Sequence, residues 1–167
     1  MSKVRKPKTG EPKPLDAYDK ALTLLVRREH SARELKSKLT RRGLDSDAAS
    51  EALAKLQAKD FQSDTRFGAM LVRSRIEGGY GPRWIIAELK THGIGEAGAR
   101  ELIDAAEPDW AELVRRQLQR RYGGKSAKSL GERAKRAAFL LRRGFDAATV
   151  QSVTRAEGLD SSADELD

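Results

Sequence analysis

The sequence predicts an all-α protein in which a three-helix unit of helix-turn-helix type occurs three times in tandem, the units stacking into an elongated, curved solenoid. The first observation behind this prediction is a glycine that recurs at Gly43, Gly93 and Gly144, 50 and 51 residues apart. The second is a set of apolar residues at matching distances from each glycine. The third is that no long segment alternates polar and apolar residues with the period of two that a half-buried strand requires. Units near 50 residues would not be comfortably stable alone, which favours stacking of neighbouring units over a compact bundle.

Each recurring glycine ends an amphipathic stretch, where we expect it to close a helix. The left-handed conformation of the last turn costs glycine little and costs residues with a Cβ more. A large apolar residue follows each glycine and is expected to pack back on the helix. The predicted core lies four residues before each glycine and one, six and nine residues after it: Leu39, Leu89, Leu140; Leu44, Ile94, Phe145; Ala49, Ala99, Val150; and Ala52, Leu102, Val153.

The first helix of each unit is predicted from apolar residues spaced three and four apart, which lie on one face of a helix. Asp16, the pair Ser63 and Asp64, and Asp109 precede these helices. The predicted buried faces are Tyr18, Leu22, Leu25 and Val26 in the first unit, Phe67 and Leu71 in the second, and Trp110, Val114, Leu118 and Tyr122 in the third.

The middle and last helices are predicted from their start signals. A serine with a glutamate three residues later has the spacing of a capping box, and a proline is favoured at the first helical position. The middle helices have Ser31 with Glu34, Gly81 with Pro82, and Ser129 with Glu132. The third of these begins about one turn earlier relative to its glycine than the other two do. The last helices follow Asp45, Gly95 and Asp146, all acceptable N-caps.

These signals divide the chain into five segments. We assign residues 15–60, 61–109 and 110–158 to the three repeats, residues 1–14 to a disordered basic arm and residues 159–167 to an acidic tail. The arm has no apolar stretch behind its basic residues, so it is not a signal peptide, and no apolar run approaches the ~20 residues of a membrane span. The chain has no cysteine, which excludes disulfides and thiolate metal sites. We expect a cytoplasmic monomer that makes no membrane contact.

Positive charge is concentrated in the third repeat. Residues 110–158 carry 12 Lys and Arg against 4 Asp and Glu, whereas residues 15–109 carry 16 of each kind. The third repeat therefore has an excess as large as the net charge of the whole chain, +8. At about 100° per helical residue, Arg116 and Arg120 lie about 160° from Leu118, so they should point away from the core.

We call the basic residues of this repeat up to Arg143 the basic ridge and expect it to bind nucleic acid or an acidic protein groove. The alternative is that these residues form an ordinary solvated helix surface. The basic ridge consists of Arg115, Arg116, Arg120, Arg121, Lys125, Lys128, Arg133, Lys135, Arg136, Arg142 and Arg143, and Arg73, Arg75 and Arg83 are secondary candidates.

Other local signals are weaker. The segment Gly123–Ser126 (GGKS) resembles the end of a phosphate loop, but that motif needs a glycine where Gln119 stands and should follow a strand. His30 and His92 are expected at the surface or as helix caps. The segment 78–84 could present aromatic rings and Arg83 to bases, although we favour a loop with Trp84 docked between repeats. No carboxylate pair suggests acid–base catalysis, and we expect neither a cofactor nor a metal site.

The motifs taken together resemble those of the bacterial RecX family of recombination regulators, over about residues 15–157. The similar segments are the Ser-x-x-Glu-Leu opening at 31–35, Arg-Arg-Gly-Leu at 41–44, FGAMLVRSR at 67–75, GYGP at 79–82 and LLRRGFD at 140–146. Their order and their period make the resemblance specific. It implies three tandem three-helix units that bind along a RecA–DNA filament and inhibit the ATPase, strand-exchange and coprotease activities of RecA, without chemistry of their own.

The rival interpretation is a tandem helix-turn-helix protein that binds DNA or RNA directly. A reader of base sequence should present Asn, Gln or Arg at the start of its recognition helix. The corresponding starts here are Asp45–Ala48, Gly95–Gly98 and Asp146–Ala148, which are small or acidic. These residues argue against base readout. A third possibility, an enzyme, has no residue constellation to support it.

Overall fold

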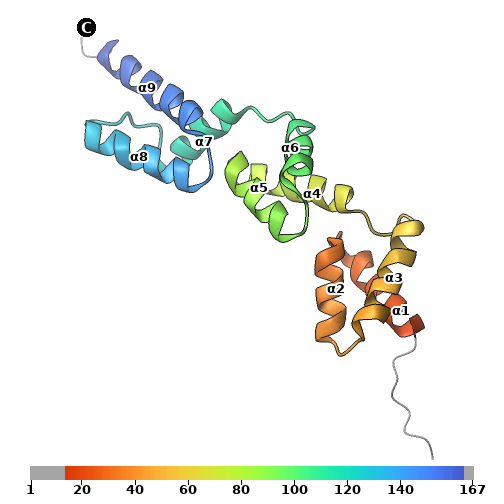
Figure 1. The fold of residues 1–167 in the computed structure, drawn as a ribbon. Helices are drawn as coiled ribbons and strands as arrows, with labels where there is room; N and C mark the ends of the chain where they lie inside the picture. The colour runs from red at the N-terminus through yellow and green to blue at the C-terminus, as the bar shows by residue number, and fades with distance from the viewer. Residues whose placement is uncertain (1–13, 164–167) are drawn as a thin grey trace, which may run out of the picture. The chain divides into compact units, whose positions relative to one another are not determined.

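The structure is a computed structural model that describes residues 14–163, with side chains described for residues 17–156. Within that range it contains nine α-helices and no strand (Figure 1). The helices are α1 Pro14–Arg27, α2 Ala32–Arg41, α3 Ser46–Ala58, α4 Asp64–Glu77, α5 Pro82–Thr91, α6 Glu96–Asp104, α7 Trp110–Tyr122, α8 Leu130–Arg142 and α9 Ala147–Ala163. The predicted all-α fold of three tandem three-helix repeats is confirmed.

The structure describes only part of the two terminal segments that the sequence predicts. Residues 1–13 of the predicted arm and residues 164–167 of the predicted tail lie outside the described residues. Helix α9 ends at Ala163, within the segment that we expected to be the acidic tail. The described chain divides into two compact units at Asp64, the first containing α1–α3 and the second α4–α9.

All three recurring glycines have the expected left-handed backbone, with φ of 83° at Gly43, 87° at Gly93 and 86° at Gly144. Each turn has the hydrogen bonds of a Schellman motif. In the first, Gly43 N–H donates to the Thr40 carbonyl and Leu44 N–H to the Leu39 carbonyl. The apolar residue after the glycine therefore points back into the core.

The predicted start of the first helix is wrong, because α1 begins at Pro14 and Asp16 lies within it. The predicted starts of the middle helices are confirmed. The side chains of Ser31 and Ser129 accept hydrogen bonds from the backbone N–H of Glu34 and Glu132, and Gly81 caps α5 with Pro82 as its first residue. Helix α8 has 13 residues whereas α2 and α5 have 10, as the earlier start signal in the third repeat predicted.

The core of the first unit is built largely from small side chains. Helix α1 packs on α3, with Ala17 and Ala21 fully buried near Ala49 and Ala52. The prediction for α1 is wrong in one respect, because Val26 is 81% exposed. Alanines allow the two helices to approach closely, so the buried face of α1 is rotated toward Ala17, Ala21 and Leu24.

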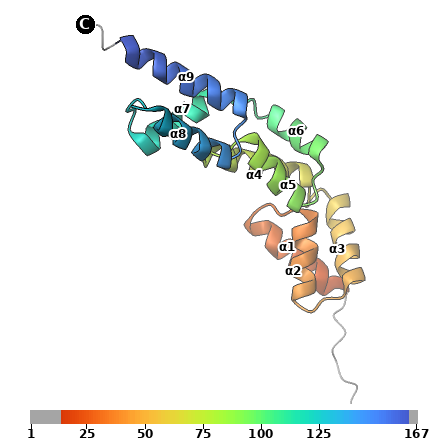
Figure 2. The same ribbon diagram turned by 60° about the vertical axis from the view of Figure 1, so that its left-hand side comes forward.

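The second unit contains two core clusters, one for each repeat. The first includes Phe67, Ile85 and Leu89, and the second includes Leu140 and Phe145. Of the twelve predicted core positions, Ile94 and Leu102 are half-buried, and both pack against Gly68 of α4. In the third repeat, α9 packs against both α7 and α8 (Figure 2).

The two repeats of the second unit share side chains and a backbone junction. Ile76 and Trp110 pack against both core clusters. The junction joins the end of α8 to the start of α5, where Gly81 N–H donates to the Arg143 carbonyl at 2.8 Å and Arg83 N–H donates to the Gly144 carbonyl at 3.0 Å. A Cβ on Gly81 would lie 2.3 Å from Phe145 N, so this junction requires glycine.

Gly81→Ala should destabilise the protein, and Gly95→Ala is its matched control. Both glycines are N-caps with negative φ, but a Cβ on Gly95 would meet open space. We expect Gly81→Ala to lower the free energy of unfolding by about 1–3 kcal/mol more than Gly95→Ala does, because the new methyl forces α5 and α8 apart. Chemical denaturation followed by circular dichroism measures the difference. Equal stabilities would show that the junction does not contribute to folding.

Candidate nucleic-acid interface

Helix α7 separates an apolar face from a basic one. Leu113, Val114 and Leu118 are buried, whereas the four arginines of this helix, Arg115, Arg116, Arg120 and Arg121, are exposed. Lys125 and Lys128 follow in the exposed loop, and Lys135 and Arg142 are exposed on α8. Most of the basic ridge is therefore available to solvent, as an interface for phosphates requires.

Arg115 and Arg116 border a hollow between α7 and α9. Its volume is about 470 Å³, and Gln119, Gly124, Val153 and Ala156 are among its lining residues. Arg115 lies 3.3 Å from Glu112, but both side chains are more than half exposed, so the ion pair is screened by solvent. The positive charge of Arg115 remains available to a polyanion.

Arg120 and Arg121 border a second hollow, of about 240 Å³, with Gly78, Phe139 and Arg143. The Arg121 guanidinium lies 4.4 Å from the centre of the Phe139 ring. Stacking on a ring orients a guanidinium without neutralising it and leaves its N–H edge free to bind phosphate. This hollow joins the third repeat to the loop that follows α4.

Three members of the basic ridge are less exposed than the sequence suggested. Arg136 is only 6% exposed and lies over the Tyr122 ring, at 4.5 Å from its centre, so our placement of this residue on the outer surface is wrong. It is four residues before the buried Leu140 and hence on the core face of α8, a spacing that could have shown this. Arg133 and Arg143 are half-buried.

Arg143 belongs to the junction between repeats. Its guanidinium donates to the carbonyls of Gly78 and Gly79, at 3.1 and 3.2 Å, and lies 5.2 Å from the centre of the Tyr80 ring. These contacts hold the loop after α4 against the end of α8. Nothing in the sequence around Arg143 indicated this partner, which is more than 60 residues away.

The secondary candidates lie in the second repeat. Arg73 and Arg83 are exposed, but Arg75 is half-buried and makes two hydrogen bonds of 2.6 Å to the Glu88 carboxylate. These hydrogen bonds raise the pKa of Arg75 above its ordinary value. The ion pair neutralises Arg75, so Arg73 and Arg83 are better placed to bind an anion.

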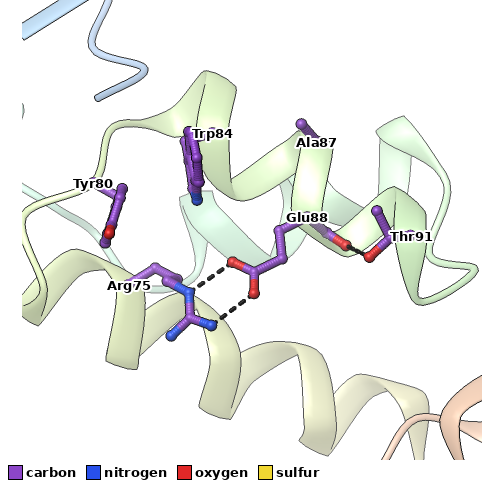
Figure 3. Close-up of a pocket in the computed structure, with 6 residues that line it drawn as sticks. All are labelled: Arg75, Tyr80, Trp84, Ala87, Glu88 and Thr91. Carbon is purple, nitrogen blue, oxygen red and sulfur yellow. Dashed lines mark hydrogen bonds and ion pairs between the residues drawn. The ribbon is translucent and has the colours of Figure 1, made fainter. Parts of the chain in front are cut away.

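Arg75 and Glu88 also line a hollow of about 630 Å³ with Tyr80, Trp84, Ala87 and Thr91 (Figure 3). Trp84 is 46% exposed, and its ring stacks on Tyr80 with 5.2 Å between ring centres. Our expectation that Trp84 is docked between the repeats is therefore wrong for its side chain. Only its backbone and Cβ approach the junction, at Gly144.

The remaining sequence signals have structural explanations. Gly123, with φ of 67°, caps the end of α7, so the GGKS segment closes a helix, whereas a phosphate loop precedes one. His92 caps the end of α5, as predicted. His30 is 2% exposed and precedes Ser31, the N-cap of α2, so our expectation of a surface residue or a helix cap is wrong for it; its burial lowers its pKa.

The partner of His30 is Glu34, 3.1 Å away. Partial burial alone would raise the pKa of Glu34, but hydrogen bonds from Arg28, Lys38 and His30 outweigh that effect and lower it to about 2. This cluster stabilises the start of α2. The basic side chains of this cluster have the Glu34 carboxylate as their common partner, in contrast to the arginines of the third repeat that lie over aromatic rings.

Clusters of metal ligands and membrane-spanning helices are both absent from the part of the chain that the structure describes. It contains no group of three or more His, Cys, Asp or Glu side chains that could hold a metal ion. None of its helices has the length and apolar character needed to cross a membrane.

Comparison with known proteins assigns all three repeats to one family. Residues 17–56, 63–106 and 107–154 match the first, second and third three-helix domains of RecX. The regulatory protein RecX of Stenotrophomonas maltophilia (strain K279a) is 45% identical over 144 residues, covering 86% of this chain and 88% of that protein. The regulatory protein RecX of Xanthomonas axonopodis pv. citri (strain 306) is 45% identical over 136 residues, covering 81% and 84%.

A solved structure has the same fold. The crystal structure of RecX from Lactobacillus salivarius superposes with a TM-score of 0.72 and covers 87% of this chain and 97% of that one. Its sequence identity is 23%, so this likeness concerns the fold alone. The resemblance identified from the sequence motifs is confirmed.

Reversing Arg116 and Arg120 to Glu should weaken binding to DNA and flatten its salt dependence. Each lost phosphate contact should reduce the slope of log K against log salt by about 0.9 for duplex DNA. Both side chains are exposed, so the melting temperature should change little. The matched control reverses Arg41 and Arg42, which are also exposed, and changes the net charge equally.

Fluorescence anisotropy with labelled DNA over a salt series compares the two double variants. Equal binding and equal slopes would mean that net charge alone matters and that the basic ridge is a solvated surface.

Proposed function

Because this chain belongs to the RecX family of regulatory proteins, we propose that it binds RecA–DNA filaments and inhibits the recombinase, ATPase and coprotease activities of RecA. Through this inhibition it modulates recombination, DNA repair and the SOS response. The observation that carries the proposal is the match of all three repeats, in order, to the domains of RecX.

The distribution of charge supports this role. A RecA filament on DNA is a periodic assembly that contains a polyanion. The exposed arginines of α7 provide a basic surface for phosphates, while the charge-balanced first and second repeats remain available for protein contacts. Several weak contacts on one chain act together, because after the first contact forms the others are intramolecular.

Inhibition of this kind requires binding and no reaction. A ligand shifts a two-state assembly by its difference in affinity for the two states, so a protein that prefers one form of the filament changes its activity. We therefore propose a regulator without catalytic activity of its own.

The second candidate is a tandem helix-turn-helix protein that binds DNA directly. Two observations favour it: each repeat has a helix-turn-helix arrangement, and the third repeat has exposed lysines and arginines. The start of α3 argues against it, because the Asp45 carboxylate caps that helix by accepting hydrogen bonds from Asp47 and Ala48 N–H. A carboxylate at the tip of a recognition helix would repel DNA phosphates.

We expect the purified protein to slow DNA-dependent ATP hydrolysis and strand exchange by RecA at stoichiometric or lower amounts, and to hydrolyse no ATP alone. The reason is that a bound regulator changes the state of the filament that it contacts. A coupled ATPase assay and a strand-exchange assay measure both activities, with the Arg116→Glu, Arg120→Glu variant as the comparison. An unchanged RecA rate across the titration, with filaments shown intact by electron microscopy, would refute the proposal.

A further inference from the structure

The aromatic hollow of the second repeat has no role in the function proposed above. It lies between α4 and α5 and has a volume of about 630 Å³. Figure 3 shows the Trp84 ring extending from the start of α5 toward the Arg75–Glu88 pair, with Tyr80 beside it. A large apolar ring that remains 46% exposed in a structured helix is a candidate for a binding surface.

The Trp84 ring is held in place by its neighbours. It stacks on Tyr80 at an interplanar angle of 27°, and Tyr80 in turn contacts the Arg143 guanidinium. Tyr80 is itself positioned by the glycines on either side of it, Gly79 with φ of 78° and Gly81 in the junction. The ring pair is therefore preorganised, which reduces the entropy lost when a ligand stacks on it.

The other wall of the hollow is polar. Arg75 and Glu88 form two parallel hydrogen bonds of 2.6 Å, so a planar donor group and a planar acceptor group lie edge to edge near the rings. Both remain partly exposed, at 33% and 24% of their side-chain surfaces. This wall can offer both a donor and an acceptor to a flat ligand.

We propose that this hollow binds an unpaired base of single-stranded nucleic acid, which stacks on Trp84 while its hydrogen-bonding edge faces Arg75 and Glu88. Proteins that bind single strands combine stacking rings with a basic track for the backbone. Arg83 is exposed next to Trp84, and Arg143 connects Tyr80 to the hollow that Arg120 and Arg121 line.

The alternative ligand is an apolar side chain of a partner protein. Such a side chain would gain from the rings but would have no use for the polar wall and the adjacent cations. The structure therefore favours the base. The proposal rests on the nucleic-acid contact in the proposed function and does not depend on RecA.

Tryptophan fluorescence provides a direct test, because the chain has only two tryptophans, Trp84 and Trp110. In the full-length Trp110→Phe variant all tryptophan emission comes from Trp84. Oligothymidylate should quench this emission. An oligonucleotide of the same length with abasic residues, which has the same charge but no bases, should not. In the Trp84→Phe variant, which retains Trp110, neither oligonucleotide should quench the tryptophan emission.

Binding measurements complete the test. Trp84→Ala should weaken oligothymidylate binding by about 5- to 150-fold, the loss expected for one base–ring stack. The affinity for the abasic strand and the salt slope should be unchanged, since no phosphate contact is removed. Phe61→Ala removes a ring of similar exposure, 48% against 46% for Trp84, from outside the hollow and should change neither affinity.

Several results would overturn the proposal. It is wrong if Trp84 emission responds equally to both strands, if neither strand binds at low salt, or if Trp84→Ala weakens binding to both strands equally. It is also wrong if oligothymidylate binds without quenching Trp84, which would leave the hollow to an apolar side chain of a partner protein. Since the assays contain no RecA, these outcomes leave the inhibition of RecA to be judged separately.

Discussion

The hydrogen-bonded junction between the end of α8 and the start of α5 determines how the second and third repeats present their surfaces. Helix termini leave carbonyl and N–H groups without partners inside the helix. Here the Arg143 and Gly144 carbonyls accept hydrogen bonds from Gly81 and Arg83 N–H, so each terminus satisfies the other. The negative end of one helix dipole also meets the positive end of the next. Because Cβ atoms on Gly81 or Gly144 would collide with backbone atoms across the junction, the contact depends on glycine at both positions.

Arginines are held differently in the three repeats, and this difference creates the basic surface. In the first repeat Arg28 contacts Glu34, and in the second Arg75 contacts Glu88. In the third, Arg121 and Arg136 lie over aromatic rings, and Arg143 binds both a ring and carbonyl groups. Rings and carbonyls position a guanidinium but do not cancel its charge. Arg136 is buried and Arg143 belongs to the junction, so the surface charge comes from the exposed arginines of α7, which the junction holds beside the Trp84 hollow.

The sequence could predict the parts of this structure that depend on neighbouring residues. The period of the glycines, their left-handed turns and the caps of α2, α5 and α8 all follow from local rules, and the structure has them. The errors have more than one origin. Arg136 could have been placed on the core face from its spacing to Leu140, whereas other environments depend on how the helices pack. Val26 is exposed because α1 packs Ala17 and Ala21 against the alanines of α3, and the Trp84 ring stacks on Tyr80 and does not enter the junction. The contact of Arg143 with Gly78 joins residues far apart in the chain, and no local pattern encodes it.

The central claim is that the protein recognises the RecA–DNA filament as an assembly, and co-sedimentation tests it most directly. The protein would be centrifuged with RecA filaments on single-stranded DNA, with the same DNA alone and with RecA alone, over a series of salt concentrations. The account predicts that filaments retain the protein at salt concentrations where naked DNA releases it, since protein contacts add to phosphate contacts that salt weakens. Equal or tighter retention by naked DNA at every salt concentration would contradict the account and favour a protein that binds DNA directly.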